Sequence, residues 1–190
     1  MMTAVVWILA VGAGLILLIL LLVYRFQTQI IYPSSLPPGS RTHVELPSAH
    51  GMSYEDIALR SADDVRLTAY LIAASRESQA KDITLLYFHA NAGNMGHRLP
   101  FIRKLRSVLT PFDPNIFLLS YRGYGLSDGS PDENGLRLDA QAALDFIIQS
   151  AMPTTKVVVM GASLGGAVAA YLACKNQEKV VFLTKNYQCE

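Results

Sequence analysis

Residues 161–165 contain the serine best placed to do chemistry. The segment reads Gly-Ala-Ser-Leu-Gly, with the serine at position 163. It follows the apolar run Val157–Met160 and precedes the small-residue stretch Gly166–Ala170. A buried strand, a sharp turn and the start of a helix are the context in which G-x-S-x-G forms a nucleophile elbow. This context predicts that the Ser163 hydroxyl is presented for attack on a carbonyl carbon.

The flanking residues have identifiable roles in such a turn. Gly161 and Gly165 permit a strained turn and close packing of helix on strand, which an ordinary tight turn would also use. An attacking serine needs a base for its proton and donors for the oxyanion. The backbone N–H of Leu164 is expected to be one such donor, while its side chain packs.

A second group of candidate residues lies at His89–Asn94, directly after a predicted strand. Its glycine and small residues let the main chain approach a substrate carbonyl, and the backbone N–H of Asn91 is the candidate second oxyanion donor. His89 could act as a general base, but we favour a histidine that is hydrogen-bonded within the loop and holds its shape. We interpret His97, farther along, as a surface or capping residue.

A third group of residues, Tyr121–Gly129, follows another predicted strand. Its two spaced glycines and the pair Asp128-Gly129 indicate a tight loop. Arg122 could bind an anionic substrate group, but we favour a bracing role through hydrogen bonds or an ion pair, which its planar guanidinium suits. The Gly-x-Gly lacks the dinucleotide-binding spacing, so no nucleotide cofactor is predicted.

The apolar patterns that must position these loops alternate between strand and helix. Two strands in an expected antiparallel hairpin come first, at Tyr54–Arg60 and Val65–Ala73. The later strands are expected at Ile83–Phe88, Asn115–Ser120, Lys156–Met160 and Lys179–Thr184. The helices are expected at Gly96–Leu109, Asn134–Ser150 and Ala167–Lys175. Alternation of this kind predicts an α/β fold with a mostly parallel sheet.

The N-terminal segment has a different character. Ala4–Tyr24 contains no charged residue, and as a helix it would span roughly 31 Å, which matches a bilayer core of about 30 Å. A cleaved signal peptide or a buried core helix would be the alternatives, but Met1–Thr3 carries no side-chain charge and the apolar run is long for a signal peptide. We therefore predict a single-pass membrane anchor at residues 4–24, a connector at 25–53, irregular from Gln27 on, and the α/β domain at 54–190. Arg25 favours a cytoplasmic body.

Composition narrows the classes of ligand. The 16 basic and 15 acidic residues give a formal net charge of +1, and no basic stripe interleaved with aromatics points to nucleic acid. Two cysteines are too few for a structural zinc site. We expect no cofactor and no metal. The sequence specifies neither the particular membrane nor an oligomeric state.

With these blocks placed, the chain resembles the α/β-hydrolase superfamily, and within it the membrane-anchored bud-emergence-type proteins and their α/β-hydrolase-domain relatives. The resemblance covers Gln27–Val180 and rests on His89–Arg98, Tyr121–Ser127, Gly161–Ala167 and the N-terminal anchor. It implies an α/β-hydrolase fold. It also implies Ser163 as the catalytic nucleophile, with the backbones of Asn91 and Leu164 as the oxyanion hole.

The implied activity is ester or thioester hydrolysis without a cofactor, on lipid or acylated-protein substrates such as palmitoylated proteins. The family order is serine, then Asp or Glu, then His, whereas all four histidines precede Ser163 and only Glu178 and Glu190 are acidic after it. We therefore expect a chain that is truncated before the acid and base of the triad. The alternative hypothesis is an inactive pseudo-hydrolase or fragment that acts as a binding or interaction protein.

Overall fold

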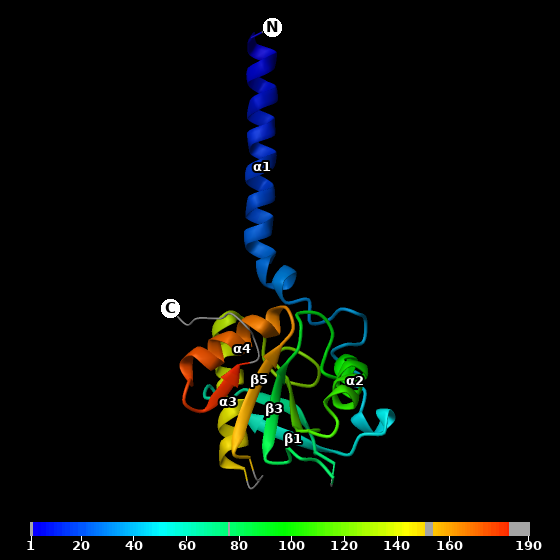
Figure 1. Ribbon diagram of the computed structural model, residues 1–190. Helices are drawn as coiled ribbons and strands as arrows, with labels where there is room; N and C mark the ends of the chain where they lie inside the picture. The colour runs from blue at the N-terminus through cyan, green and yellow to red at the C-terminus, as the bar shows by residue number, and fades with distance from the viewer. Residues whose placement is uncertain (1, 76, 151–153, 183–190) are drawn as a thin grey trace.

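A mixed sheet of six strands forms the centre of the molecule, with helices on both faces and a long helix projecting from one end (Figure 1). The computed structural model describes residues 2–75, 77–150 and 154–182. The strands are β1 (Tyr54–Arg60), β2 (Arg66–Ile72), β3 (Ile83–Phe88), β4 (Asn115–Ser120), β5 (Lys156–Gly161) and β6 (Val180–Phe182). The helices are α1 (Met2–Ile31), α2 (Leu99–Leu109), α3 (Glu133–Gln149) and α4 (Leu164–Lys175), with short 3-10 helices at Pro47–His50 and Gly96–Arg98.

The strand order within the sheet is β1-β2-β4-β3-β5-β6. β1, β2 and β4 pair antiparallel, whereas β4, β3, β5 and β6 run parallel. The predicted α/β-hydrolase fold, with an antiparallel N-terminal hairpin and a mostly parallel remainder, is confirmed. The predicted last strand agrees with β6 up to Phe182, and its remaining residues lie outside the described part of the chain.

The order of the parallel strands creates a topological switch point, where successive connections lead to opposite sides of the sheet. From β3 the connection through α2 leads to β4 on one side, and from β5 the connection through α4 leads to β6 on the other side. In α/β sheets, ligands bind beyond the carboxyl ends of the strands at such a switch point. Phe88 and Gly161, the last residues of β3 and β5, are register partners. The loops that follow them therefore leave the sheet side by side.

Two apolar cores cover the two faces of the sheet. One lies against α3 and α4 and contains large buried residues such as Phe88, Phe117 and Leu144. The other lies under α2 and contains Leu99, Ile102 and Leu118. Strands β3 and β4 are nearly fully buried, as expected for parallel strands that are covered on both faces.

Helices begin and end at slightly different places from those that the sequence suggests. α1 continues past the apolar run to Ile31, so the start of the expected irregular connector is helical. The helix ends there because the next residue, Tyr32, precedes Pro33, and the residue before a proline disfavours helix. α4 begins at Leu164 rather than Ala167, which places Ser163 immediately before it. The expected helix from Gly96 begins with a 3-10 turn, and Pro100 lies in the first turn of α2, where proline is tolerated.

A buried ion pair joins the loop after β4 to α3. The Arg122 guanidinium donates from Nε to Asp139 Oδ1 at 3.0 Å, and its backbone N–H donates to Asp139 Oδ2 at 2.7 Å. It also donates to both carboxylate oxygens of Asp63, in the β1–β2 turn, at 2.7 and 2.8 Å. These bonds to Asp63 are the main cause that raises the pKa of Arg122, and the same bonds lower the pKa of Asp63. Arg122 therefore ties together the hairpin, the loop and α3, which is the bracing role favoured above.

Replacing Arg122 with methionine should destabilise the fold strongly. The side chain of Asp139 is 0% exposed, so the variant would leave a buried carboxylate without its cation, a change that typically costs about 3–5 kcal/mol. Chemical denaturation in detergent micelles, followed by circular dichroism, measures the loss. Arg60→Met is the matched control, since Arg60 pairs with Asp64 at the surface and should leave the midpoint nearly unchanged. Equal midpoints for the two variants would contradict the assigned role.

Candidate active site

The turn between β5 and α4 holds Ser163 in a conformation that few residues adopt. Its backbone angles are φ 52° and ψ −117°, and φ is positive although the residue is not glycine. Such a backbone costs on the order of 1–3 kcal/mol and persists only where surrounding contacts enforce it. The residue is exposed, so the turn holds Ser163 at the surface, beside the carboxyl ends of the parallel strands.

Backbone hydrogen bonds fix this turn against the end of β3. The Ala162 N–H donates to the carbonyl of Phe88 at 3.1 Å. Within the turn, the Gly165 N–H donates to Ala162 O at 2.9 Å and the Gly166 N–H to Ser163 O at 2.8 Å. The turn is thus bonded both to itself and to the neighbouring strand, which keeps Ser163 at the switch point.

Two of the three glycines are required by space. A Cβ on Gly161 would lie 1.9 Å from the carbonyl oxygen of Gly165, and a Cβ on Gly165 would lie 2.1 Å from the carbonyl oxygen of Phe88. A Cβ on Gly166 would meet its nearest atom, Gly161 O, at 3.7 Å, which is ordinary contact distance. Close packing of α4 on β3 therefore depends on Gly161 and Gly165, the two glycines of the G-x-S-x-G motif.

The loop after β3 lies beside this turn and carries Asn91. Its carbonyl accepts a hydrogen bond from the Tyr124 hydroxyl at 2.8 Å, and its side-chain Nδ2 donates to the carbonyl of Ile31, at the end of α1, at 3.1 Å. Within the described residues, no hydrogen bond is donated by the backbone N–H of Asn91 or of Leu164. Both amides are therefore available as donors, and they belong to the two loops that leave β3 and β5 side by side.

His89 lies beneath this loop and is fully buried. Its Nδ1 is 2.7 Å from the carbonyl of Ala90, and its ring lies 4.4 Å from the ring of Tyr121 and 5.1 Å from that of Tyr124. Burial lowers the pKa of His89 to about 4. A general base must be within hydrogen-bond reach of the proton that it removes. A side chain enclosed by two tyrosines supports the loop instead.

The neighbouring loop at Tyr121–Gly129 supports the Asn91 loop from below. The Tyr121 hydroxyl donates to the carbonyl of His89 at 3.1 Å, in addition to the bond from Tyr124 to Asn91. Burial raises the pKa of both tyrosines above the ordinary value, so the hydroxyl groups stay protonated donors. Nothing in the spacing of these tyrosines along the sequence pointed to this role, because the contacts join residues more than thirty positions apart.

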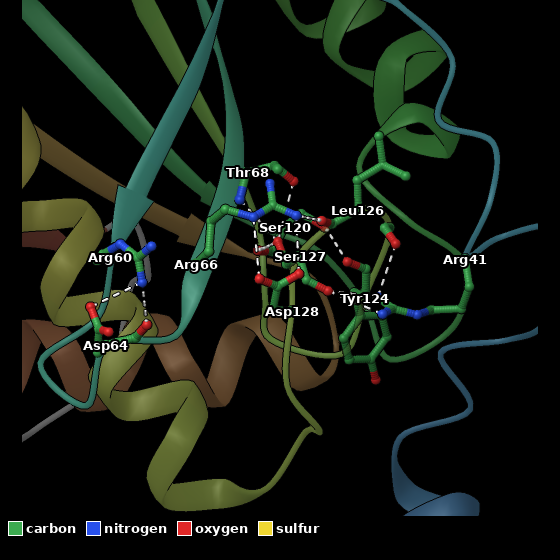
Figure 2. Close-up of polar contacts among 11 residues, drawn as sticks. Arg41, Arg60, Asp64, Arg66, Thr68, Ser120, Tyr124, Leu126, Ser127 and Asp128 are labelled. Atoms are coloured by element: carbon green, nitrogen blue, oxygen red, sulfur yellow. Dashed lines mark hydrogen bonds and ion pairs between the residues drawn. The ribbon is translucent and has the colours of Figure 1, made fainter.

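Figure 2 shows how this supporting loop is fastened to the sheet. The Ser127 hydroxyl accepts from the Thr68 N–H at 2.9 Å, and Arg66 pairs with Asp128 at 3.0 Å. From the connector, Arg41 donates to the carbonyl of Ser127 at 3.0 and 3.1 Å. These side chains come from β2, the connector and the loop itself, so three parts of the chain hold the loop in one shape.

His97 has a local role in the same region. The Asn94 N–H donates to His97 Nδ1 at 3.0 Å, and the Nδ2 of Asn94 donates to the carbonyls of Ser40 and His43 at 2.9 and 2.8 Å. His97 is exposed and closes the turn that precedes α2, in agreement with the capping role favoured above. Across the described ranges, no three His, Cys, Asp or Glu side chains gather in a group that could hold a metal ion.

Alanine substitutions at Gly165 and Gly166 should have opposite effects. Gly165→Ala forces a Cβ against the Phe88 carbonyl, so the turn must open or α4 must shift, and we expect a loss of about 2 kcal/mol or more. Gly166→Ala meets no clash and replaces glycine in a helix, so it should be neutral or stabilising by up to about 1 kcal/mol. Thermal unfolding of the two variants measures the difference. A Gly165→Ala variant as stable as Gly166→Ala would show that the close contact is unimportant.

Comparison with known proteins places the chain in a family. The pattern of the alpha/beta hydrolase fold family matches residues 83–183. Protein bem46 of Schizosaccharomyces pombe is 49% identical over 158 residues, which cover 83% of this chain and 52% of bem46. The alpha/beta hydrolase domain-containing protein WAV2 of Arabidopsis thaliana is 40% identical, with 88% of this chain and 53% of WAV2 covered. An uncharacterized membrane protein of Saccharomyces cerevisiae is 37% identical, with 80% and 51% covered.

Solved structures agree on the fold. An alpha-beta hydrolase from Vibrio vulnificus has a TM-score of 0.62 at 21% identity, with 83% of this chain and 55% of that chain covered. The esterase Pf2001 of Pyrococcus furiosus has a TM-score of 0.57 at 19% identity, with 74% and 55% covered. The chain spans about half the length of the relatives named above. The family resemblance predicted from the three loops is confirmed: this chain belongs to the α/β-hydrolase fold family.

Proposed function

We propose that this chain carries the nucleophile and the oxyanion hole of a membrane-anchored serine hydrolase that cleaves ester or thioester bonds of lipids or acylated proteins. The observation that carries the proposal is the backbone of Ser163, which has a positive φ at an exposed turn directly after a parallel strand. A strained, exposed serine at that place is the geometry of a nucleophile elbow. The fold family and the esterase neighbour support the same class of chemistry.

The proposed reaction uses these groups in turn. Ser163 Oγ attacks the acyl carbon while the triad base takes its proton, and the backbone N–H groups of Leu164 and Asn91 donate to the oxygen that becomes negative. Such donors are each worth about 10²–10³-fold in rate. The base then returns the proton to the leaving alcohol or thiol. Collapse of the tetrahedral intermediate expels the alcohol or thiol and leaves an acyl-serine, which water then hydrolyses. We expect the acid and base of the triad to follow Ser163 in the order nucleophile, acid, base that the family has.

A fluorophosphonate probe tests the nucleophile. Residues 164–190 contain no histidine, so residues 1–190 alone should react slowly at Ser163, because a site without one triad member retains a rate only about 10³–10⁴-fold above that in water. Added imidazole should accelerate the labelling by serving as the missing base. Mass spectrometry of the labelled peptide identifies the serine. Ser163→Ala should abolish the signal with and without imidazole.

The control is Ser127, which is buried and should stay unlabelled. Labelling that persists in Ser163→Ala would contradict the assignment of the nucleophile. A chain that remains unlabelled at every imidazole concentration would favour the alternative, an inactive binding or interaction protein.

We propose that α1 is the single-pass anchor. Within α1, the candidate span Thr3–Ile31 is 29 residues long, its most apolar window has a mean hydropathy of 3.0, and none of that window is buried within the protein. Exposed leucine, isoleucine and valine side chains line most of its length, which an apolar solvent would cover. The uncharacterized yeast relative is called a membrane protein, in line with this proposal.

Charged substitutions within α1 should release the protein from membranes. Leu15→Arg together with Leu18→Arg would cost about 2.5–3.5 kcal/mol for each arginine at the centre of the bilayer. Extraction of membranes at alkaline pH, followed by immunoblotting of pellet and supernatant, measures the outcome. The native chain should remain in the pellet and the double variant should not. Recovery of a native chain shortened by the apolar segment would instead indicate a cleaved signal peptide.

A further inference from the structure

A pocket of about 410 Å³ opens at the foot of α1, between α1 and the first turns of α3 and α4. Figure 1 shows α1 meeting the body at the end of the sheet where the turn between β5 and α4 lies. The volume is in the range of about 300–1,000 Å³ that small-molecule sites occupy. Leu164, the residue after Ser163, is part of the lining. The pocket therefore begins next to the candidate nucleophile.

The lining of this pocket is mostly apolar. Leu136, Leu164, Ala167 and Val168 form the side contributed by α3 and α4, and Ile31 closes it from α1. Two charged side chains at the pocket, Glu133 and Arg137, satisfy each other, since Arg137 Nη2 donates to Glu133 Oε1. Arg137 also lies 4.5 Å from the centre of the Tyr171 ring.

The two charged side chains of the pocket thus have partners without a ligand. Burying an alkyl group there would remove apolar surface from water, worth about 25 cal/mol per Å², and would leave no new charge unpaired.

Tyr32 separates this pocket from a second one of a different character. The second pocket, of about 420 Å³, is lined by Pro33 and Pro131 together with polar side chains from the end of α1, the connector and the loop before α3, including Arg25, Gln29, Ser34 and Ser130. Of these two pockets, only the first has leucine and valine side chains in its lining, so it is the better match for an alkyl chain.

We propose that the pocket formed by Ile31, Leu136, Leu164, Ala167 and Val168 binds the long acyl chain of a membrane-resident ester or thioester substrate, with the scissile carbonyl at Ser163. The proposal rests on the proposed function for its chemistry but not for the binding of the chain. It selects long-chain over short-chain acyl groups, because only a long chain can fill the pocket.

The position of the pocket relative to α1 explains how such a chain would arrive. The apolar run ends at Tyr24, and the helix continues to Ile31, a rise of roughly 10 Å at about 1.5 Å per residue. The polar layer on one side of a bilayer is about 5–8 Å thick. The mouth of the pocket at Ile31 would therefore lie just outside the headgroup layer, where an acyl chain that leaves the bilayer along α1 reaches the α/β domain.

Photocrosslinking tests the pocket with the full chain in phosphatidylcholine vesicles. The probe is palmitic acid that bears a diazirine, and mass spectrometry maps the adducts. We expect adducts at Glu133–Arg137 and Leu164–Val168, which excess palmitate removes and butyrate does not. Adducts on α1, which lies in the lipid, serve as the internal reference. The Ser163→Ala variant should retain the pocket adducts, so a failure of the proposed catalysis would be distinguishable from a failure of this proposal.

A pocket-filling variant supplies the second test. Ala167→Trp places a large side chain in the pocket and should lower the pocket adducts about tenfold relative to those on α1, a loss of about 1.4 kcal/mol in binding. Ala142→Trp is the matched control, because Ala142 lines a separate pocket of about 380 Å³ between α3 and the β1–β2 hairpin. Adducts confined to α1 in the native chain, competition by butyrate, or equal adducts in the two variants would each overturn the proposal.

Discussion

The close approach of α4 to the end of β3 is the constraint on which the candidate site depends. It is possible because Gly165 has no side chain at the point where the Phe88 carbonyl lies, and because that same carbonyl accepts the N–H of Ala162. The contact forces the chain to reverse within a few residues. Ser163 bears the resulting backbone strain, and the free amide of Leu164 follows from the start of a helix, where the first N–H groups have no intrahelical acceptor.

The second loop of the site is held by polar contacts from the neighbouring loop. Tyr121 and Tyr124 bond to its carbonyls from below, and Arg122 anchors the supporting loop to Asp139 and Asp63. The backbone N–H of Asn91 donates no hydrogen bond within the described part of the chain. Rigid support of this kind keeps donors in place before a charge develops, and this preorganisation is the main source of electrostatic stabilisation in acyl transfer.

Much of this architecture could be predicted from local patterns. The continuous apolar runs identify β3, β4 and β5, and the glycines around Ser163 identify the turn, because each signal lies within a few adjacent residues. The ends of helices were less predictable. Gln27–Ile31 has weak apolar character although it is helical, and the glycine-rich start of α4 has low helix propensity, so packing on β3 decides that the helix starts at Leu164.

The contacts between loops could not be predicted from the sequence. The bonds from Tyr124 to Asn91 and from Asn91 to Ile31 join distant parts of the chain, and they depend on strand order rather than on spacing. For His89 we weighed a general base against support of the loop, and for Arg122 substrate binding against bracing. In each case the two roles differ only in what surrounds the side chain. Burial and the identity of the hydrogen-bond partners distinguish them, and both are properties of the folded chain.

The hydrogen bond between the Asn91 side chain and the last carbonyl of α1 has a consequence for how substrates are met. A domain on a flexible tether samples a large volume of solution, whereas this domain is hydrogen-bonded to its own N-terminal helix at the loop beside Ser163. With α1 seated in a bilayer, Ser163 would travel by lateral diffusion at a nearly constant height. Under the proposed function, the rate of hydrolysis would then follow the surface density of substrate in the leaflet, and dilution of the surrounding solution would leave that rate unchanged.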